Sequence, residues 1–247
     1  IGSILSHGCC LDTAVRVTSA GSRPQAFAAR AMRSRTSARA GGGTDISGGF
    51  WTMARTAAAL SARAGGRKPL PALLFFTDPA RTPDISAVAE RLPRGSAIVY
   101  RAFGAANAEA AALTLKAIAR RRGLRLLIGA DEALAAKVKA DGVHLPERLA
   151  HRARAIRRPG WLVTAAAHSP RAARSALASG ADAVVVSAVF PSNSASAGAP
   201  LGPLRLAQIV RMAGGPVYGL GGVNDKTARR LLRAGLVGLA GVEAFRT

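Results

Sequence analysis

Cysteine, aromatic residues and acidic residues are all scarce in this 247-residue chain. The only cysteines are the neighbours Cys9 and Cys10, which seldom bond each other, and no Cys/His spacing is typical of a metal site. This excludes a disulfide-stapled secreted domain and favours a cytoplasmic protein with reduced thiols. No run approaches the ~20 apolar residues of a membrane-spanning helix, so we expect no membrane segment.

The scarcity of acids leaves 35 Lys and Arg against 13 Asp and Glu, a formal net charge of +22. Such an excess is typical of proteins that bind nucleic acids. The aromatic residues, only 4% of the chain, do not alternate with the cations as a base-stacking surface requires. We therefore expect solvated, Arg-rich helix faces and no specific nucleic-acid partner, and weak polyanion binding at low salt stays open.

Residues 1–52 are rich in Ser, Arg, Ala and Gly and show no sustained hydrophobic period. We predict a disordered basic extension there. Two origins stay open for it: upstream sequence before a true start at Met53, which we favour, or a targeting segment, since it is poor in acids.

From residue 70 to residue 247, short apolar runs alternate with helix-like stretches. The predicted strands cover residues 73–77, 97–102, 125–129, 142–145, 162–167, 183–189, 216–220 and 238–242. The predicted helices include residues 106–122, 132–139, 146–157, 170–179 and 204–212. This order predicts an α/β fold, a (β/α)₈ TIM barrel. A doubly wound open sheet is the alternative, but its first strand would be followed by G-x-G-x-x-G, which is absent here.

A glycine pair, Gly221-Gly222, follows the strand predicted at 216–220, and a helix-like stretch and the last strand come after it. In (β/α)₈ barrels the loops after strands 7 and 8 frequently bind a phosphate. Glycine lets backbone N–H groups approach an anion closely. A tight turn without a ligand would use the same pair, so both interpretations stay open.

Five short motifs at the predicted strand ends resemble, in this order, the thiamine phosphate synthase/TenI family. They are Tyr100-Arg101, Ala140-Asp141-Gly142-Val143-His144-Leu145, Ala167-His168-Ser169, Val189-Phe190-Pro191-Ser192-Asn193-Ser194 and Gly219-Leu220-Gly221-Gly222-Val223. The resemblance covers the whole predicted barrel. It implies a role in thiamine biosynthesis or salvage and a small phosphorylated substrate.

The family resemblance implies one of two activities. A synthase joins hydroxymethylpyrimidine pyrophosphate to a thiazole phosphate with Mg²⁺ and releases pyrophosphate. The TenI branch isomerises a thiazole carboxylate phosphate with a histidine as acid and base. In both, the thiazole phosphate binds to the backbone after strands 7 and 8, which implies phosphate binding by Gly221, Gly222 and Val242. The hydroxyls of Ser192 and Ser194 are further candidate donors.

Arg101 and His168 are the candidate catalytic residues. Arg101 is a candidate pyrophosphate ligand, since a guanidinium binds an anionic group through two N–H groups, and a rim arginine is the alternative. His168 is a candidate TenI-type acid and base, and a histidine that caps or packs the loop is the alternative. His144 we expect to orient the barrel rim through hydrogen bonds.

The chain departs from the family pattern around the pyrophosphate and the metal. The family's Asn-Asp after strand 3 falls on Gly129-Ala130, so Asp131 is the nearest carboxylate there, and Glu147 is nearest to the second acidic position. These two are the candidate Mg²⁺ ligands, although neither is in register.

Two family lysines are replaced by Phe103 and Ala195, and Glu243 stands where a serine usually donates to the phosphate. Lost cations predict a degraded Mg–pyrophosphate site and weak synthase activity. Three functions stay open: a thiazole phosphate-binding family member with that degraded site, an active synthase, and a TenI-like tautomerase or a non-catalytic phosphate-binding protein. The oligomeric state is unknown.

Overall fold

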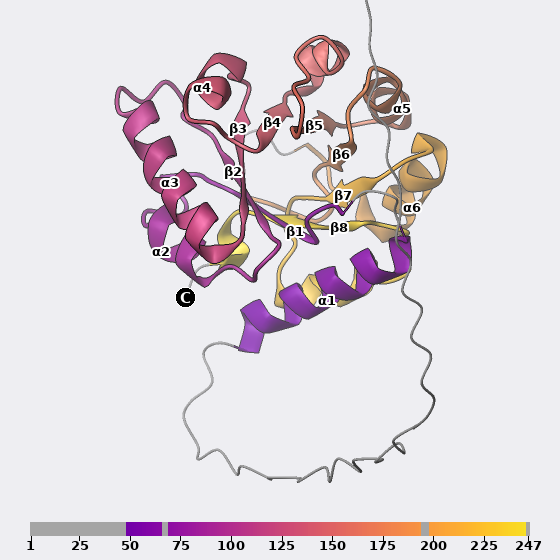
Figure 1. Ribbon diagram of the computed structural model, residues 1–247. Helices are drawn as coiled ribbons and strands as arrows, with labels where there is room; N and C mark the ends of the chain where they lie inside the picture. Colours follow the sequence, from indigo (N-terminus) through magenta and orange to yellow (C-terminus); the bar gives the residue numbers. More distant parts are fainter. Residues whose placement is uncertain (1–47, 66–68, 194–197, 246–247) are drawn as a thin grey trace, which may run out of the picture. The chain divides into compact units, whose positions relative to one another are not determined.

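The computed structural model describes residues 48–65, 69–193 and 198–245. In these residues eight parallel strands close into a barrel in which each strand pairs with the next and the last pairs with the first (Figure 1). The strands are β1 (Leu73–Phe76), β2 (Ala97–Tyr100), β3 (Arg125–Gly129), β4 (Gly142–Leu145), β5 (Leu162–Ala167), β6 (Ala183–Val186), β7 (Val217–Gly219) and β8 (Gly238–Gly241). The (β/α)₈ barrel that the alternating pattern predicts is confirmed, and the open sheet is excluded.

Helices on the outside of the barrel connect the strands (Figure 1). They are α1 (Gly48–Ala64), α2 (Ile85–Arg91), α3 (Ala108–Arg122), α4 (Glu132–Lys137), α5 (Pro170–Ala178), α6 (Gly202–Ala213) and α7 (Asp225–Ala228), with the 3₁₀ helices η1 (Glu147–Arg152), η2 (Arg229–Leu231) and η3 (Glu243–Phe245). The α-helix expected at 146–157 is wrong: only a short 3₁₀ helix forms there, and Pro146 offers its first turn no capping side chain.

Apolar side chains fill both faces of the barrel wall. Because successive residues of a strand point to opposite faces, Leu74 and Phe76 point into the barrel while Leu73 and Phe75 pack under the helices. Tyr218 lies inside the barrel, where its hydroxyl donates to the Pro71 carbonyl at 2.6 Å. Burial raises the pKa of Tyr218, so the phenol stays protonated and keeps this bond. A packed interior leaves the carboxyl ends of the strands as the place for a site.

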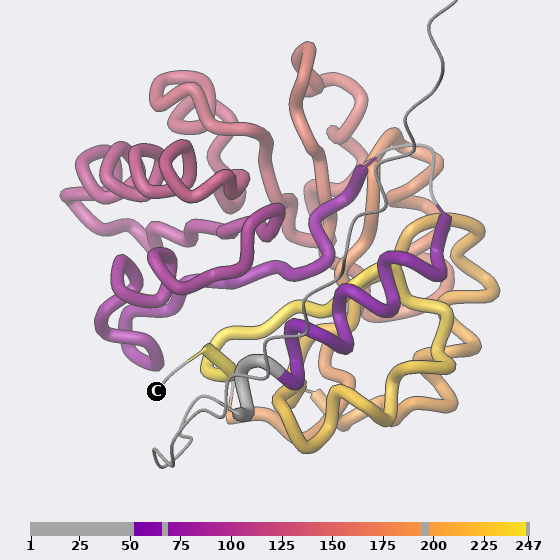
Figure 2. The backbone as a smooth tube through the Cα atoms, turned by 60° about the horizontal axis from the view of Figure 1, so that its bottom comes forward, coloured from indigo at the N-terminus to yellow at the C-terminus, as the bar shows by residue number. Residues whose placement is uncertain are grey.

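Helix α1 runs along the outside of the barrel and packs on β8, β1 and α7 (Figures 1 and 2). Met53, Ala57 and Leu60, spaced three and four residues apart, are buried, and Arg63 donates to the Leu232 carbonyl. In the described part of the chain only η3 follows β8, so α1 covers the seam where the barrel closes. Helix α1 begins at Gly48, inside the range 1–52 for which we predict an extension, and the extension itself stays a prediction. Residues 1–47 lie outside the described residues.

No helix among the described residues has the length and hydropathy to cross a bilayer.

We predict that Met53→Ala lowers the free energy of unfolding by about 2–5 kcal/mol, because it removes a fully buried side chain from the seam between α1 and β8. The matched control is Arg55→Ala on the exposed side of the same helix, which we expect to change stability by less than about 0.5 kcal/mol. Urea unfolding followed by circular dichroism measures both. Equal effects of the two variants would show that α1 does not stabilise the barrel.

Candidate active site

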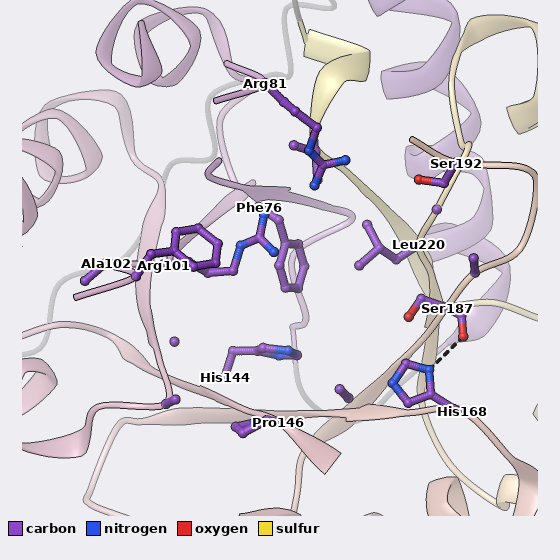
Figure 3. Close-up of a pocket in the computed structure, with 17 residues that line it drawn as sticks. Phe76, Arg81, Arg101, Ala102, His144, Pro146, His168, Ser187, Ser192 and Leu220 are labelled. Atoms are coloured by element: carbon purple, nitrogen blue, oxygen red, sulfur yellow. Dashed lines mark hydrogen bonds between the residues drawn. The ribbon is translucent and has the colours of Figure 1, made fainter. Parts of the chain in front are cut away.

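A cavity of about 450 Å³ opens at the carboxyl ends of the strands (Figure 3). Six residues singled out in the sequence lie on its wall: Arg101, His144, His168, Ser192, Gly221 and Val242. The short strands bring these residues together because parallel strands of a barrel all end on the same face. The sequence places them far apart, between the second and the eighth strand.

Arg101 follows β2, and the end of β1 holds it in place. Its backbone N–H donates to Thr77 Oγ1 at 2.9 Å, and its Nε donates to the Thr77 carbonyl at 2.8 Å. The guanidinium lies between two aromatic rings, 5.8 Å from the centroid of Phe76 and 4.9 Å from that of Phe103. Burial lowers the pKa of Arg101, and nearby Asp78 opposes this, so the side chain remains a cation.

Asp78 joins Arg101 to a second cation that the sequence analysis did not single out, Arg81. Arg81 Nε donates to Asp78 Oδ2 at 2.8 Å, and Arg101 Nη2 lies 3.5 Å from the same oxygen. Burial acts to raise the pKa of Asp78, but the two guanidiniums outweigh it and the pKa is lowered. Arg81 reaches into the cavity from the side opposite the two histidines (Figure 3). An aspartate and an arginine three residues apart, directly after a strand, would have been the sequence signal.

His144 is buried in the floor of the cavity, with Nδ1 2.9 Å from Thr164 Oγ1 and its ring edge-on to Phe76. Burial, assisted by the charge of Arg101, lowers the pKa of His144 to about 3. The imidazole is therefore neutral near pH 7. This environment supports the rim-orienting role that we expect from the sequence.

His168 lies on the cavity wall next to the end of β6. Its Nδ1 is 2.9 Å from the Ser187 carbonyl oxygen, which can only accept, so Nδ1 carries the proton (Figure 3). The other ring nitrogen is turned toward the cavity (Figure 3). The cap of α5 is the neighbouring Ser169, whose hydroxyl accepts from the Ala172 N–H, so His168 is not the helix cap.

A smaller cavity of about 190 Å³ adjoins the large one at the ends of β7 and β8. Its wall includes Ser192, Gly221, Gly222, Val242 and Glu243. Both glycines have positive φ, and a Cβ at Gly222 would lie 2.3 Å from the Pro191 carbonyl oxygen. Only glycine allows the loop this close approach, so the pair does shape the backbone around the cavity. Ser194 lies outside the described residues.

The candidate metal ligands make other contacts. Asp131 caps α4 by accepting from the Leu134 N–H at 2.8 Å, and Glu147 accepts from the His168 N–H at 2.7 Å. Neither lines either cavity, and the described ranges contain no group of three potential metal ligands. Asp131 and Glu147, as the structure places them, therefore do not fit a Mg²⁺ site at these cavities.

Comparisons with known proteins agree with the strand-end motifs. The profile of a family described as thiamine monophosphate synthase matches residues 73–245. A thiamine-phosphate synthase from Alcanivorax borkumensis is 33% identical over 183 residues, which cover 70% of this chain and 84% of the relative. One from Pyrococcus furiosus is 30% identical over 176 residues, covering 70% and 85%. A solved structure, thiamine phosphate pyrophosphorylase from Pyrococcus furiosus, superposes with a TM-score of 0.61 at 28% identity, covering 70% of this chain and 85% of that one.

The buried His144 predicts a pH dependence of stability. The unfolded chain protonates this imidazole below pH ~6.5, whereas the folded chain does so only near its lowered pKa of about 3. The free energy of unfolding therefore falls as pH drops below 6.5, and at pH 5 this group alone accounts for a loss of about 2 kcal/mol. His144→Asn should flatten the profile between pH 7.5 and 5 in urea unfolding. The control, His151→Asn at an exposed position, should not. Parallel profiles for wild type and His144→Asn would contradict the assignment.

Proposed function

The chain belongs to the thiamine monophosphate synthase family, and we propose that it binds a thiazole phosphate at the mouth of the barrel, with the phosphate in the smaller cavity. One observation carries this proposal: the two cavities share Arg81, Ser192, Leu220, Gly221 and Val242 on their walls. A single ligand can therefore extend from one to the other. The family resemblance makes thiamine biosynthesis or salvage the process it serves.

The large cavity suits the ring end of such a ligand. Phe76, Ala166, Ala188 and Leu220 give its wall apolar surface, and a few polar groups converge on it. The smaller cavity suits the phosphate end, because glycine backbone and the Ser192 hydroxyl offer donors to an anion. This division into an apolar and a polar end supports a phosphate ester with a small ring.

The large cavity has few cationic groups that could bind the pyrophosphate of a synthase substrate. The cations on the wall of the large cavity are Arg81 and Arg101, and both are bonded to Asp78. Phe103, at the position of a family lysine, is 66% exposed and lies over the Arg101 guanidinium. Charge stabilisation of the leaving pyrophosphate is a large part of catalysis in such a reaction. We therefore propose that synthase activity is weak.

A tautomerase of the TenI type is the second candidate, and His168 favours it. The Ser187 carbonyl fixes the proton on Nδ1, which leaves the lone pair of Nε2 free to accept a proton from a bound ligand. In the proposed isomerisation the same nitrogen returns the proton at another atom of the ligand, so that no net proton is gained or lost. The exposed position of His168 at the mouth gives a substrate access to it.

Two assays on the full chain test the function. With hydroxymethylpyrimidine pyrophosphate, thiazole phosphate and Mg²⁺, we expect pyrophosphate release at least about 100-fold below ordinary enzyme turnover. With a thiazole carboxylate phosphate, His168→Gln should lower isomerisation by about 100-fold or more, whereas the matched variant His151→Gln, on the exposed surface of η1, should leave it unchanged.

Thiazole phosphate should also raise the melting temperature of the chain in the absence of turnover. Pyrophosphate release at ordinary enzyme rates would contradict the degraded site. Full isomerisation by His168→Gln would remove the tautomerase candidate. No thermal shift with thiazole phosphate would contradict the proposed ligand itself.

A further inference from the structure

The segment that follows β1 is hydrogen-bonded to the end of β8, the strand that pairs with β1 where the barrel closes. The backbone N–H groups of Arg81 and Thr82 both donate to the Asp78 carbonyl, at 3.0 and 2.7 Å. The buried hydroxyl of Thr82 donates to the Val242 carbonyl at 3.4 Å. These bonds hold Arg81 beside Val242, at the point where the two cavities meet.

The ion pair between Arg81 Nε and Asp78 positions the Arg81 side chain and leaves its terminal nitrogens out of that bond. Its Nε donates to Asp78, and its side chain is only 18% exposed. Its terminal nitrogens are turned toward the shared wall of the cavities (Figure 3). One of them, Nη1, lies 3.9 Å from Glu243 Oε1, so the terminal N–H groups face a carboxylate.

The charges around this point cancel. Arg81 and Arg101 carry two positive charges, and Asp78 and Glu243 carry two negative ones. Asp78 is enclosed, with a side chain 17% exposed, whereas the Glu243 side chain is 37% exposed and, within the ranges that the structure describes, its one ion pair is the long contact to Arg81. Glu243 is therefore the carboxylate that can leave, and its departure gives the smaller cavity a net positive charge.

We propose that Arg81 binds the ligand's phosphate through its terminal N–H groups and that the Glu243 carboxylate competes with the phosphate for them, an inference that rests on the proposed phosphate site. Asp78 keeps Arg81 in position while Glu243 turns out to solvent. A free phosphate ion must displace Glu243 with no other gain. A phosphate ester with a ring has the same cost but also gains contacts in the large cavity, so it binds at concentrations at which inorganic phosphate leaves Glu243 in place.

Titration calorimetry of the full chain with inorganic phosphate tests the competition. Removing the carboxylate that pairs with Arg81 at 3.9 Å in a half-exposed site is expected to raise phosphate affinity about tenfold. Glu243→Gln and Glu243→Ser should both show this rise. Adding Arg81→Gln to Glu243→Gln should abolish it.

The matched control is Glu90→Gln. Glu90 pairs with Arg121 on the outer helices, its side chain is 40% exposed, and neither cavity includes it, so this variant makes the same change in net charge away from the site. We expect it to bind phosphate like wild type. Affinities within twofold of wild type for both Glu243 variants would overturn the proposal, and so would an equal rise in Glu90→Gln.

A parallel titration with thiazole phosphate separates this inference from the proposed function. Suppose that thiazole phosphate binds wild type more tightly than inorganic phosphate does, but the Glu243 variants gain no affinity for inorganic phosphate. The proposed competition is then wrong, whereas the proposed ligand is supported. If the Glu243 variants gain affinity for inorganic phosphate and the thiazole adds none, the competition holds and the proposed ligand is wrong.

Discussion

The carboxylate of Asp78, shared between two arginines, is the interaction on which the rest of the site depends. It lies at the end of β1, draws Arg101 from β2 toward the first strand, and holds Arg81 beside the end of β8. A guanidinium in a partly buried cavity is stable only with a partner that offsets the loss of hydration. One carboxylate supplies this for both cations and leaves the mouth with a single excess positive charge before Glu243 is counted.

The closed barrel makes that arrangement possible. Strands of only three to six residues end together, so residues from β1, β2, β7 and β8 meet although the chain separates them. Helix α1 covers the seam between β8 and β1, directly behind the strands that carry Asp78 and Val242. Packing on the outside of the barrel and the placement of charges at its mouth are therefore linked through the same two strands.

Much of the fold could be predicted because buried parallel strands are continuous apolar runs, such as Leu73–Phe76 and Ala183–Val186. The glycine pair and the strand-end histidines were visible for the same reason, since each follows such a run. The start of α1 could not be predicted because the segment before it has the same Ser-, Arg-, Ala- and Gly-rich composition. The 3₁₀ form of η1 was not predicted either, and its first turn lacks a capping side chain.

The spacing of Asp78 and Arg81 after the first strand is visible in the sequence, but the contacts that join this pair to Arg101 and Glu243 are between residues distant in the chain. Glu243 was visible as an unfavourable neighbour for a phosphate, yet its partner was not. The structure shows that this partner is Arg81, so Glu243 belongs to a pair of opposite charges. Asp131 and Glu147 stand out in the sequence as candidate metal ligands, and in the structure each accepts a backbone hydrogen bond, from Leu134 and from His168.

The crystal structure of the full chain with thiazole phosphate is the measurement that tests this account most directly. We expect the phosphate in the smaller cavity, with its oxygens about 3 Å from an Arg81 terminal nitrogen and from backbone nitrogen in the Gly221-Gly222 loop, and with Glu243 turned away from Arg81. A phosphate bound at Arg101 on the other side of the mouth, with Glu243 still facing Arg81, would contradict it.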